Sequence, residues 1–291
     1  MGGTMIRQSC LCEYINHYAA THTEQLSLGY LEQLHVAVRL LCRQCGKHVR
    51  LSELRDELIN DYCDWLTSIG RAPDTVRGRR NCLLTLWRDA YQQEVLETRP
   101  DRIRKIRARR QVPRAWTHEQ VCTLVRSALQ DSSLLSNGIP RGLWLASLIA
   151  AGWDTALRLG DLLAMPSGDF APSSPFVVQQ HKTGDDVVVS LSDTTVHLIH
   201  RCIAAGETRQ QIWPLWAGRE QFFVQMRKLV KRSGVPAGTF KWVRRGAITD
   251  VEAAGGNGSL LAGHRSRAVT EGHYLDTQIL CKHQRRPQPL E

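Results

Sequence analysis

A basic stretch between residues 99 and 114 divides this sequence into two parts of different character. It contains eight arginine or lysine residues and one acid, Asp101, and Pro113 interrupts the chain near its end. The stretch therefore carries seven of the ten excess positive charges of the whole chain. We interpret it as a linker between two domains, over 99–115, which either follows a phosphate backbone or is a solvated charged segment.

The part before the linker predicts a small helical bundle. Apolar residues recur at helical spacing in three segments, 24–44, 52–70 and 74–90. Gly46 suits the end of the first helix, and Asp74 suits the start of the third as an N-cap residue. No strand pattern appears before residue 100. We expect a helical domain over 1–98, with about 20 residues before its first helix.

The part after the linker predicts a second domain over 116–291 that is mainly helical. Thr117 opens a capping box, and the apolar run 143–153 is too short to cross a bilayer but suits a buried helix. Two valine-rich runs around a Lys-Thr-Gly-Asp turn predict a β-hairpin over 175–191. Further helices are expected near 193–205, 219–232, 241–254 and 265–275. The predicted fold class is thus mainly α with a small antiparallel β-sheet.

The charge of the chain indicates its partner. A formal net charge of +10 favours an anionic partner, with nucleic acid before a membrane surface. The N-terminus lacks the apolar region of a secretory signal, so we expect a cytoplasmic protein that does not bind a membrane.

The nine cysteines are scattered, as reduced thiols usually are in a protein of this size. Cys10 and Cys12, together with Cys42 and Cys45, could supply four thiolates to zinc, but the two pairs lie far apart in the sequence. We favour ordinary thiols over a zinc site.

Five short segments of the second domain carry residues with chemical potential. In chain order they present Arg158, Lys182, the pair Lys241 and Arg244, His264 and Tyr274. Each has an ordinary explanation when taken alone, because an arginine can pair with a nearby acid such as Asp161, a turn lysine can be solvated and a tyrosine can belong to the core. Their order is what carries information.

That order resembles the catalytic series of the tyrosine recombinase (phage-integrase) family. The family's first box, T-G-L-R-x-x-E-L, is matched by Thr155 to Leu162, and its hairpin lysine by Lys182. Its H-x-x-R box is matched by Lys241-x-x-Arg244, its L-G-H box by Gly263-His264, and its nucleophile by Tyr274. The resemblance covers 117–276. The helical domain over 1–98 is similar to the family's core-binding domain, and the resemblance implies no separate arm-binding domain.

Two positions depart from the family pattern. Ala156 replaces a glycine, which we expect to be harmless if the turn needs no positive φ. Lys241 replaces a histidine, and Arg245 is a neighbouring candidate for the second arginine. We favour Arg244, because its three-residue step from Lys241 matches the family.

The resemblance implies DNA strand cleavage through a 3′-phosphotyrosine, without metal or other cofactor. Arg158 and Arg244 would bind the scissile phosphate, and Lys182, on a mobile hairpin tip, would protonate the leaving oxygen. His264 would donate a hydrogen bond to the phosphate, and Asp161 would orient an arginine. A protonated Lys241 would stabilise the negative charge of the pentacoordinate phosphorus. Whether Lys241 acts instead as a base stays open.

The implied protein is a site-specific recombinase, the integrase of a mobile element, acting as a homotetramer on two double-stranded DNA sites. Accessory or directionality proteins could assist it. The expected architecture is a two-domain clamp around DNA, and the C-terminal segment 275–291 could supply a contact between protomers. Alternatives are chromosome-dimer resolution, a non-catalytic DNA-binding protein and a type IB topoisomerase.

The residues expected to contact DNA are Arg77, Arg80, Arg104, Lys105, Arg107, Arg109 and Arg110.

Overall fold

In a computed structural model the chain divides into two compact units, unit 1 (Met1–Arg110) and unit 2 (Gln111–Glu291). The structure describes residues 7–22, 26–107, 111–168, 170 and 175–283. The secondary structure is helical apart from one two-stranded antiparallel sheet in the described residues, so the predicted fold class is confirmed. No described helix is long and apolar enough to cross a membrane.

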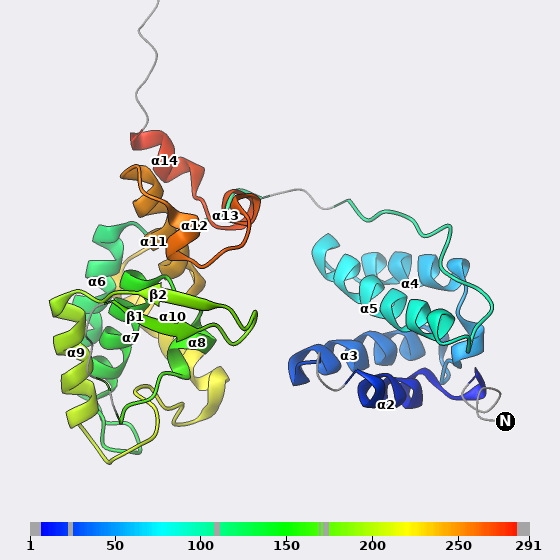
Figure 1. The fold of residues 1–291 in the computed structure, drawn as a ribbon, viewed down its shortest axis with the longest axis horizontal. Coiled ribbons are helices and arrows are strands. Elements are labelled where there is room, and N and C mark those ends of the chain that lie inside the picture. Colours follow the sequence, from blue (N-terminus) through cyan, green and yellow to red (C-terminus); the bar gives the residue numbers. More distant parts are fainter. Residues whose placement is uncertain (1–6, 23–25, 108–110, 169, 171–174, 284–291) are drawn as a thin grey trace, which may run out of the picture. The chain divides into compact units, whose positions relative to one another are not determined.

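Unit 1 is a helical bundle (Figure 1). Its elements are α2 (Leu11–Thr21), α3 (Leu28–Cys45), the 3₁₀ turn η1 (Leu51–Glu53), α4 (Asp56–Ser68) and α5 (Pro73–Gln92). Helix α3 packs against α2, α4 and α5, and its buried side chains Leu34, Val38 and Leu41 fill the bundle core. Gly46 ends α3 in the left-handed conformation, as the sequence predicts.

Two helix starts in unit 1 differ from the predictions. Helix α2 begins at Leu11, in a stretch where no helix was expected, because the Cys10 thiol accepts from the Glu13 N–H at 3.4 Å and the Glu13 carboxylate accepts from the Cys10 N–H at 2.9 Å. Cysteine is not among the usual N-cap residues, so this capping box escaped the sequence pattern. Helix α5 begins at Pro73, so Asp74 lies in its first turn and not at the N-cap.

Both ends of the predicted linker are held by the unit next to them. The N–H groups of Asp101 and Arg102 donate to the Asp56 carboxylate at 3.1 and 2.8 Å, and Ile103 and Ile106 pack on the core of unit 1. On the other side, the Ala115 N–H donates to the Asp276 carboxylate of unit 2 at 2.9 Å, and the next residue, Trp116, is fully buried. Residues 99–107 of the basic stretch are therefore an extended segment along unit 1, which we call the basic strap.

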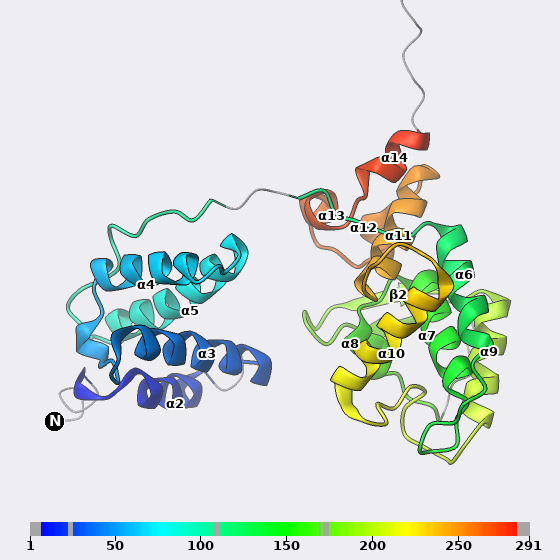
Figure 2. The ribbon, with the colours of Figure 1, turned by 180° about the vertical axis from the view of Figure 1, so that it is seen from behind.

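Unit 2 is built around α7 (Arg141–Thr155), whose side chains are buried on nearly every face. It packs against α6 (His118–Leu129), α9 (Asp193–Ala204) and α11 (Lys241–Ala253), as Figure 2 shows from behind. The remaining elements are α8 (Leu159–Leu163), β1 (Phe176–Gln179), β2 (Asp186–Val189), α10 (Gly218–Ser233), α12 (Gly258–Leu261), α13 (Arg267–His273) and α14 (Thr277–His283).

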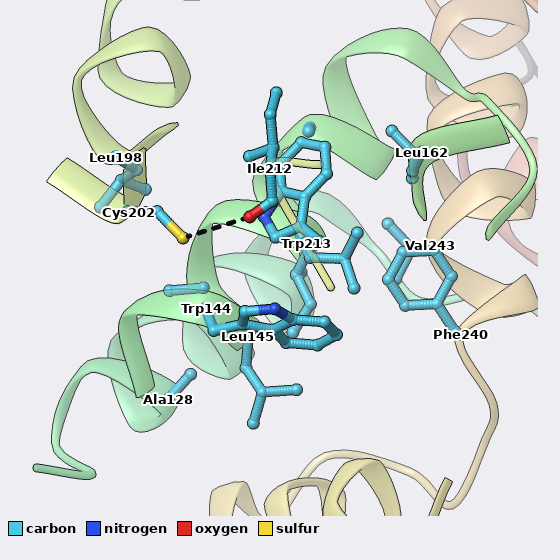
Figure 3. Close-up of a cluster of buried hydrophobic side chains, with 14 of the residues drawn as sticks. Ala128, Trp144, Leu145, Leu162, Leu198, Cys202, Ile212, Trp213, Phe240 and Val243 are labelled. Carbon is cyan, nitrogen blue, oxygen red and sulfur yellow. Dashed lines mark hydrogen bonds between the residues drawn. The ribbon is translucent and has the colours of Figure 1, made fainter. Parts of the chain in front are cut away.

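The core of unit 2 fixes the helices that carry the site. Trp144, Trp213 and Phe240 lie in one cluster of buried apolar side chains, and the Cys202 thiol donates to the Ile212 carbonyl at 4.0 Å (Figure 3). The predicted hairpin is present, with Phe176 opposite Val189 and Gln179 opposite Asp186. Its connecting turn therefore spans residues 180–185.

Candidate active site

The residues that the sequence singled out come together in unit 2. A cavity of about 520 Å³ is lined by five of them: Arg158, Lys182, Lys241, Arg244 and Tyr274. The sixth, His264, lies beside the cavity with its ring centroid 4.5 Å from that of Tyr274. The side chains arrive from the start of α8, the hairpin turn, the first turn of α11, the residue after α13 and the turn after α12.

Arg244 is the most deeply buried charge in this cluster, with 3% of its surface exposed. It donates to the carbonyl oxygens of Ala156 and Ala262, the latter at 3.1 Å, and has no carboxylate partner among the described residues. Burial lowers the pKa of Arg244 to about 10, so the guanidinium remains charged at neutral pH. Two backbone carbonyls thus hold the group without neutralising it.

Ala156 adopts the left-handed conformation, with φ of 48° and ψ of 24° at the end of α7. The turn therefore requires a positive φ. The alanine was expected to be harmless only if no positive φ was needed, so that expectation does not hold. An L-residue pays about 1 kcal/mol for this conformation. The conformation directs the Ala156 carbonyl toward Arg244, so the strained residue positions the buried guanidinium.

The hydrogen bonds of His264 define its tautomer. Its Nε2 lies 3.0 Å from Nη2 of Arg244, and its Nδ1 lies 2.7 Å from the hydroxyl oxygen of Thr270. A guanidinium can only donate, so Nε2 accepts and the proton is on Nδ1, which donates to Thr270. Burial and the Arg244 and Arg158 charges lower the pKa of His264 to about 4, which agrees with a neutral ring. In this arrangement His264 has no proton to offer a phosphate through Nε2, contrary to the sequence expectation.

Arg158 is held by the hairpin turn. Its guanidinium donates to the side-chain oxygen of Gln180 and lies 4.0 Å from a carboxylate oxygen of Asp161. The other carboxylate oxygen of Asp161 accepts from the His181 N–H at 2.9 Å. Asp161 therefore lies near an arginine, as expected, and in addition it ties the residue before Lys182 to α8.

Tyr274 lies among cations. The Arg244 guanidinium is 5.2 Å and the Lys241 ammonium 5.8 Å from its ring centroid. Burial alone would raise the pKa of the Tyr274 phenol, but the charges of Arg244, Arg158 and Lys241 outweigh burial and hold that pKa below its usual value. The surroundings therefore favour the phenolate, the nucleophilic form of this side chain.

The two lysines of the site differ in their surroundings. Burial, followed by the Arg245 charge, lowers the pKa of Lys241, and the nearby Tyr274 opposes this shift. Lys182 is exposed on the hairpin turn. Arg245 lies on another face of α11, where its guanidinium donates to the His273 and Arg114 carbonyls. The structure thus brings Arg244, and not Arg245, into the cavity.

The residues expected to contact DNA differ in whether they already have partners within unit 1. Arg77 pairs with Asp74 at 2.5 Å, Arg80 donates to the Arg104 carbonyl at 2.7 Å, and Arg104 pairs with Asp64 at 2.5 Å. Lys105 and Arg107 are exposed and have no carboxylate within ion-pair distance among the described residues. The remaining two, Arg109 and Arg110, fall outside the described residues, as does 284–291 of the predicted C-terminal contact segment.

The cysteines considered for zinc, Cys10, Cys12, Cys42 and Cys45, are free thiols in the structure. Within the described ranges, no group of three or more His, Cys, Asp or Glu side chains is arranged to hold a metal ion. Sequence reasoning missed two residues that join the site, Gln180 and Thr270. Neither belongs to a motif, because each acts through contacts with side chains distant in the sequence.

Comparison with known proteins defines the class. Residues 10–106 match the family model of the phage integrase SAM-like domain. No curated protein matches the sequence. A lambda integrase dimer bound to a core site is similar in structure, with a TM-score of 0.68 and 16% identity over 89% of this chain and 96% of that one. A lambda integrase tetramer bound to a Holliday junction gives 0.66 and 17%, over 98% and 81%.

The Tn1549 transposon integrase in complex with circular intermediate DNA also matches, with a TM-score of 0.66 and 14% identity over 95% of this chain and 99% of that one. The chain therefore shares the fold of these integrases, with a phage integrase SAM-like domain over residues 10–106. The resemblance drawn from its motifs to the tyrosine recombinase family is confirmed by this fold and by the phage integrase SAM-like domain.

Proposed function

We propose that this protein is a site-specific DNA recombinase that cleaves and rejoins strands through a phosphotyrosine at Tyr274. The observation that carries the proposal is the position of this phenol in one cavity with Arg158, Lys182, Lys241 and Arg244. A cavity lined by four cations and a phenol suits a phosphodiester, whose negative charge increases as the nucleophile attacks.

The chemistry follows from the groups present. The Tyr274 phenol loses its proton to solvent and its oxygen attacks the scissile phosphorus. A 3′-phosphotyrosine bond forms, and the bond to the 5′-oxygen breaks. Arg158 and Arg244 bind the equatorial oxygens with their planar forks. Lys182 donates the proton that the leaving oxygen needs. Attack by another strand's 5′-hydroxyl reverses the step and releases Tyr274, so the bond energy is conserved and no nucleotide cofactor is consumed.

The neutral His264 changes the role proposed for it. Because its Nε2 accepts from Arg244, the ring orients this guanidinium in the absence of DNA. A phosphate bound in the cavity would favour the protonated ring, which could then donate to an oxygen of the phosphate. Lys241 replaces the family's histidine, and we assign to it the stabilisation of the pentacoordinate phosphorus.

Unit 1 and the basic strap would bind the duplex together with unit 2, as a clamp around DNA. The lambda integrase tetramer on a Holliday junction supports a homotetramer on two duplex sites, and the transposon integrase supports a role in a mobile element. Chromosome-dimer resolution is the alternative biological context. We place the protein in the cytoplasm, with accessory or directionality proteins as further partners.

Two other functions compete with recombination. A recombinase-derived DNA-binding protein would need none of the cavity's cations, and a type IB topoisomerase would relax DNA without exchanging strands. The complete set of Arg158, Lys182, Arg244, His264 and Tyr274 around one cavity favours catalysis. Supercoiled plasmid carrying two copies of a cleaved sequence separates the three functions, because only a recombinase yields recombinant circles.

The experiment that tests the proposal lets the protein select its own site. A pool of nicked duplexes with a randomised core is incubated with the protein, covalent adducts are captured, and the attached strands are sequenced. The selected duplex is then synthesised as a suicide substrate. We expect an adduct that persists in excess EDTA. The Tyr274→Phe variant should bind this duplex and form no adduct, whereas Tyr91→Phe, at an exposed tyrosine of unit 1, should behave as wild type.

A further inference from the structure

Gln180 is a fully buried polar residue whose side chain connects three parts of the candidate active site. It follows β1 directly and precedes Lys182 by two residues. Its side-chain oxygen accepts from the Arg158 guanidinium and, at 3.3 Å, from the Thr183 hydroxyl. Its side-chain nitrogen donates to the Ala262 carbonyl at 2.9 Å.

These contacts require an amide in one orientation. A guanidinium only donates and a carbonyl only accepts, so the oxygen of Gln180 has to face Arg158 and the nitrogen has to face Ala262. A carboxylate at this position could accept from Arg158 but could not donate to Ala262. An apolar side chain of the same length could do neither.

The amide reaches the second arginine through a shared acceptor. The Ala262 carbonyl that accepts from Gln180 also accepts from Arg244 at 3.1 Å. The next residue, Gly263, packs directly on the amide, since a Cβ there would lie 2.8 Å from the Gln180 nitrogen. Gly263 also has a φ of +60°, which explains why the turn before His264 carries glycine.

We propose that Gln180 is a positioning residue for strand cleavage, which fixes the Arg158 guanidinium against the turn that carries His264. The inference rests on the proposed recombinase function. A neutral amide orients Arg158 without adding a second negative charge to that of Asp161, which lies 4.0 Å from the guanidinium. Gln180 acts through Arg158 and Arg244 and does not itself reach the cavity lining.

Two other contacts hold the hairpin turn in place, so we expect variants at Gln180 to fold. The Asp161 carboxylate accepts from the His181 N–H, and Asp185 pairs with Arg265 at 2.5 Å. We therefore choose Gln180→Met, which keeps the length and removes the amide, and Gln180→Glu, which keeps an acceptor and adds a charge. Gln179→Met is the matched control, because Gln179 is the exposed neighbour on the same hairpin.

The readouts are the Kd for the selected suicide duplex and the single-turnover rate of adduct formation. We expect Gln180→Met to keep the Kd within about twofold and to slow adduct formation by about 10- to 100-fold, since a misplaced group costs rate more than binding. Gln180→Glu should be slower still, because it also places a second carboxylate beside Arg158. Gln179→Met should match wild type in both measurements.

A double-mutant cycle with Arg158→Lys separates positioning from a general structural role. If Gln180 acts through the Arg158 fork, Gln180→Met should slow adduct formation by less than about threefold in the Arg158→Lys background. An equal slowing in both backgrounds, or a wild-type rate for Gln180→Met or Gln180→Glu, would overturn the inference alone. A wild-type protein that forms no adduct with any duplex would overturn the proposed function as well.

Discussion

The Nη2 of Arg244 lies 3.0 Å from the Nε2 of His264 and donates to it. This contact ties a buried cation to a neutral imidazole, whose other nitrogen donates to Thr270. Protonation of His264 would remove the acceptor and place two positive charges side by side. The protonation state of one histidine therefore determines whether this part of the site keeps its geometry in the absence of DNA.

The first prediction concerns stability and pH. The pKa of His264 is lowered from 6.5 to about 4 in the folded protein, so the unfolded chain binds more protons between these values. The contribution of His264 to stability is therefore present above pH 6.5 and is lost as pH falls to about 4. We expect the fall in Tm over this range to be smaller for His264→Gln than for wild type. Equal falls would contradict the assignment, and His197→Gln, at an exposed histidine, is the control.

The second prediction concerns the strained Ala156. Ala156→Gly relieves a left-handed conformation that costs about 1 kcal/mol, although glycine also increases the entropy of the unfolded chain. We expect Tm to be unchanged or to rise by a few degrees, with adduct formation retained. Ala151→Gly, at a buried position inside the same helix, should lower stability by about 1 kcal/mol. Equal destabilisation by both variants would show that Ala156 is not strained.

The third prediction concerns the basic strap. Lys105 and Arg107 are exposed and unpaired among the described residues, so they are free to contact phosphates. The double variant Lys105→Ala/Arg107→Ala should reduce the slope of log K against log salt concentration by about 1.8, which is about 0.9 for each contact. Arg104→Ala, which removes an ion pair within unit 1, should change the slope less. An unchanged slope in the double variant would place the strap in solvent.

The fourth prediction concerns Lys241. If its charge stabilises the phosphorane, Lys241→Ala should slow adduct formation by about 10²–10³-fold, and Lys241→His should retain substantial activity. Because the pKa of Lys241 is lowered, its charge is lost at a lower pH than that of an ordinary lysine. The wild-type rate should then fall as pH rises toward this pKa, and Lys241→Ala should lose that dependence. A rate that instead rises with pH through a Lys241-dependent titration would identify a base.

The sequence was sufficient to predict most of the helices, though not α2, α12 or α14, together with the hairpin and the set of side chains around the cavity. The predictions succeeded because local patterns such as the Thr117 capping box determine helix starts, and because the order of motifs identifies side chains that meet in space. The supporting contacts could not be predicted. Gln180 reaches Arg158 and Ala262 across 22 and 82 residues of sequence, and a single sequence gives no signal for such contacts.

The positive φ of Ala156 was missed for a related reason. The preference of this turn for glycine is visible from the family pattern, but whether an alanine adopts the left-handed conformation depends on the surrounding packing. The neutral state of His264 likewise depends on burial and on the Arg244 donor, neither of which the motif specifies.

The most direct test of the account is to identify the amino acid joined to DNA. The covalent adduct formed on the selected suicide duplex is digested with protease and nuclease, and the modified peptide is sequenced by mass spectrometry. We expect the modification on Tyr274, as a phosphotyrosine attached to a 3′-end, with a free 5′-hydroxyl on the released strand. A modification on any other residue, a 5′-linked adduct, or strand cleavage with no adduct would contradict the account.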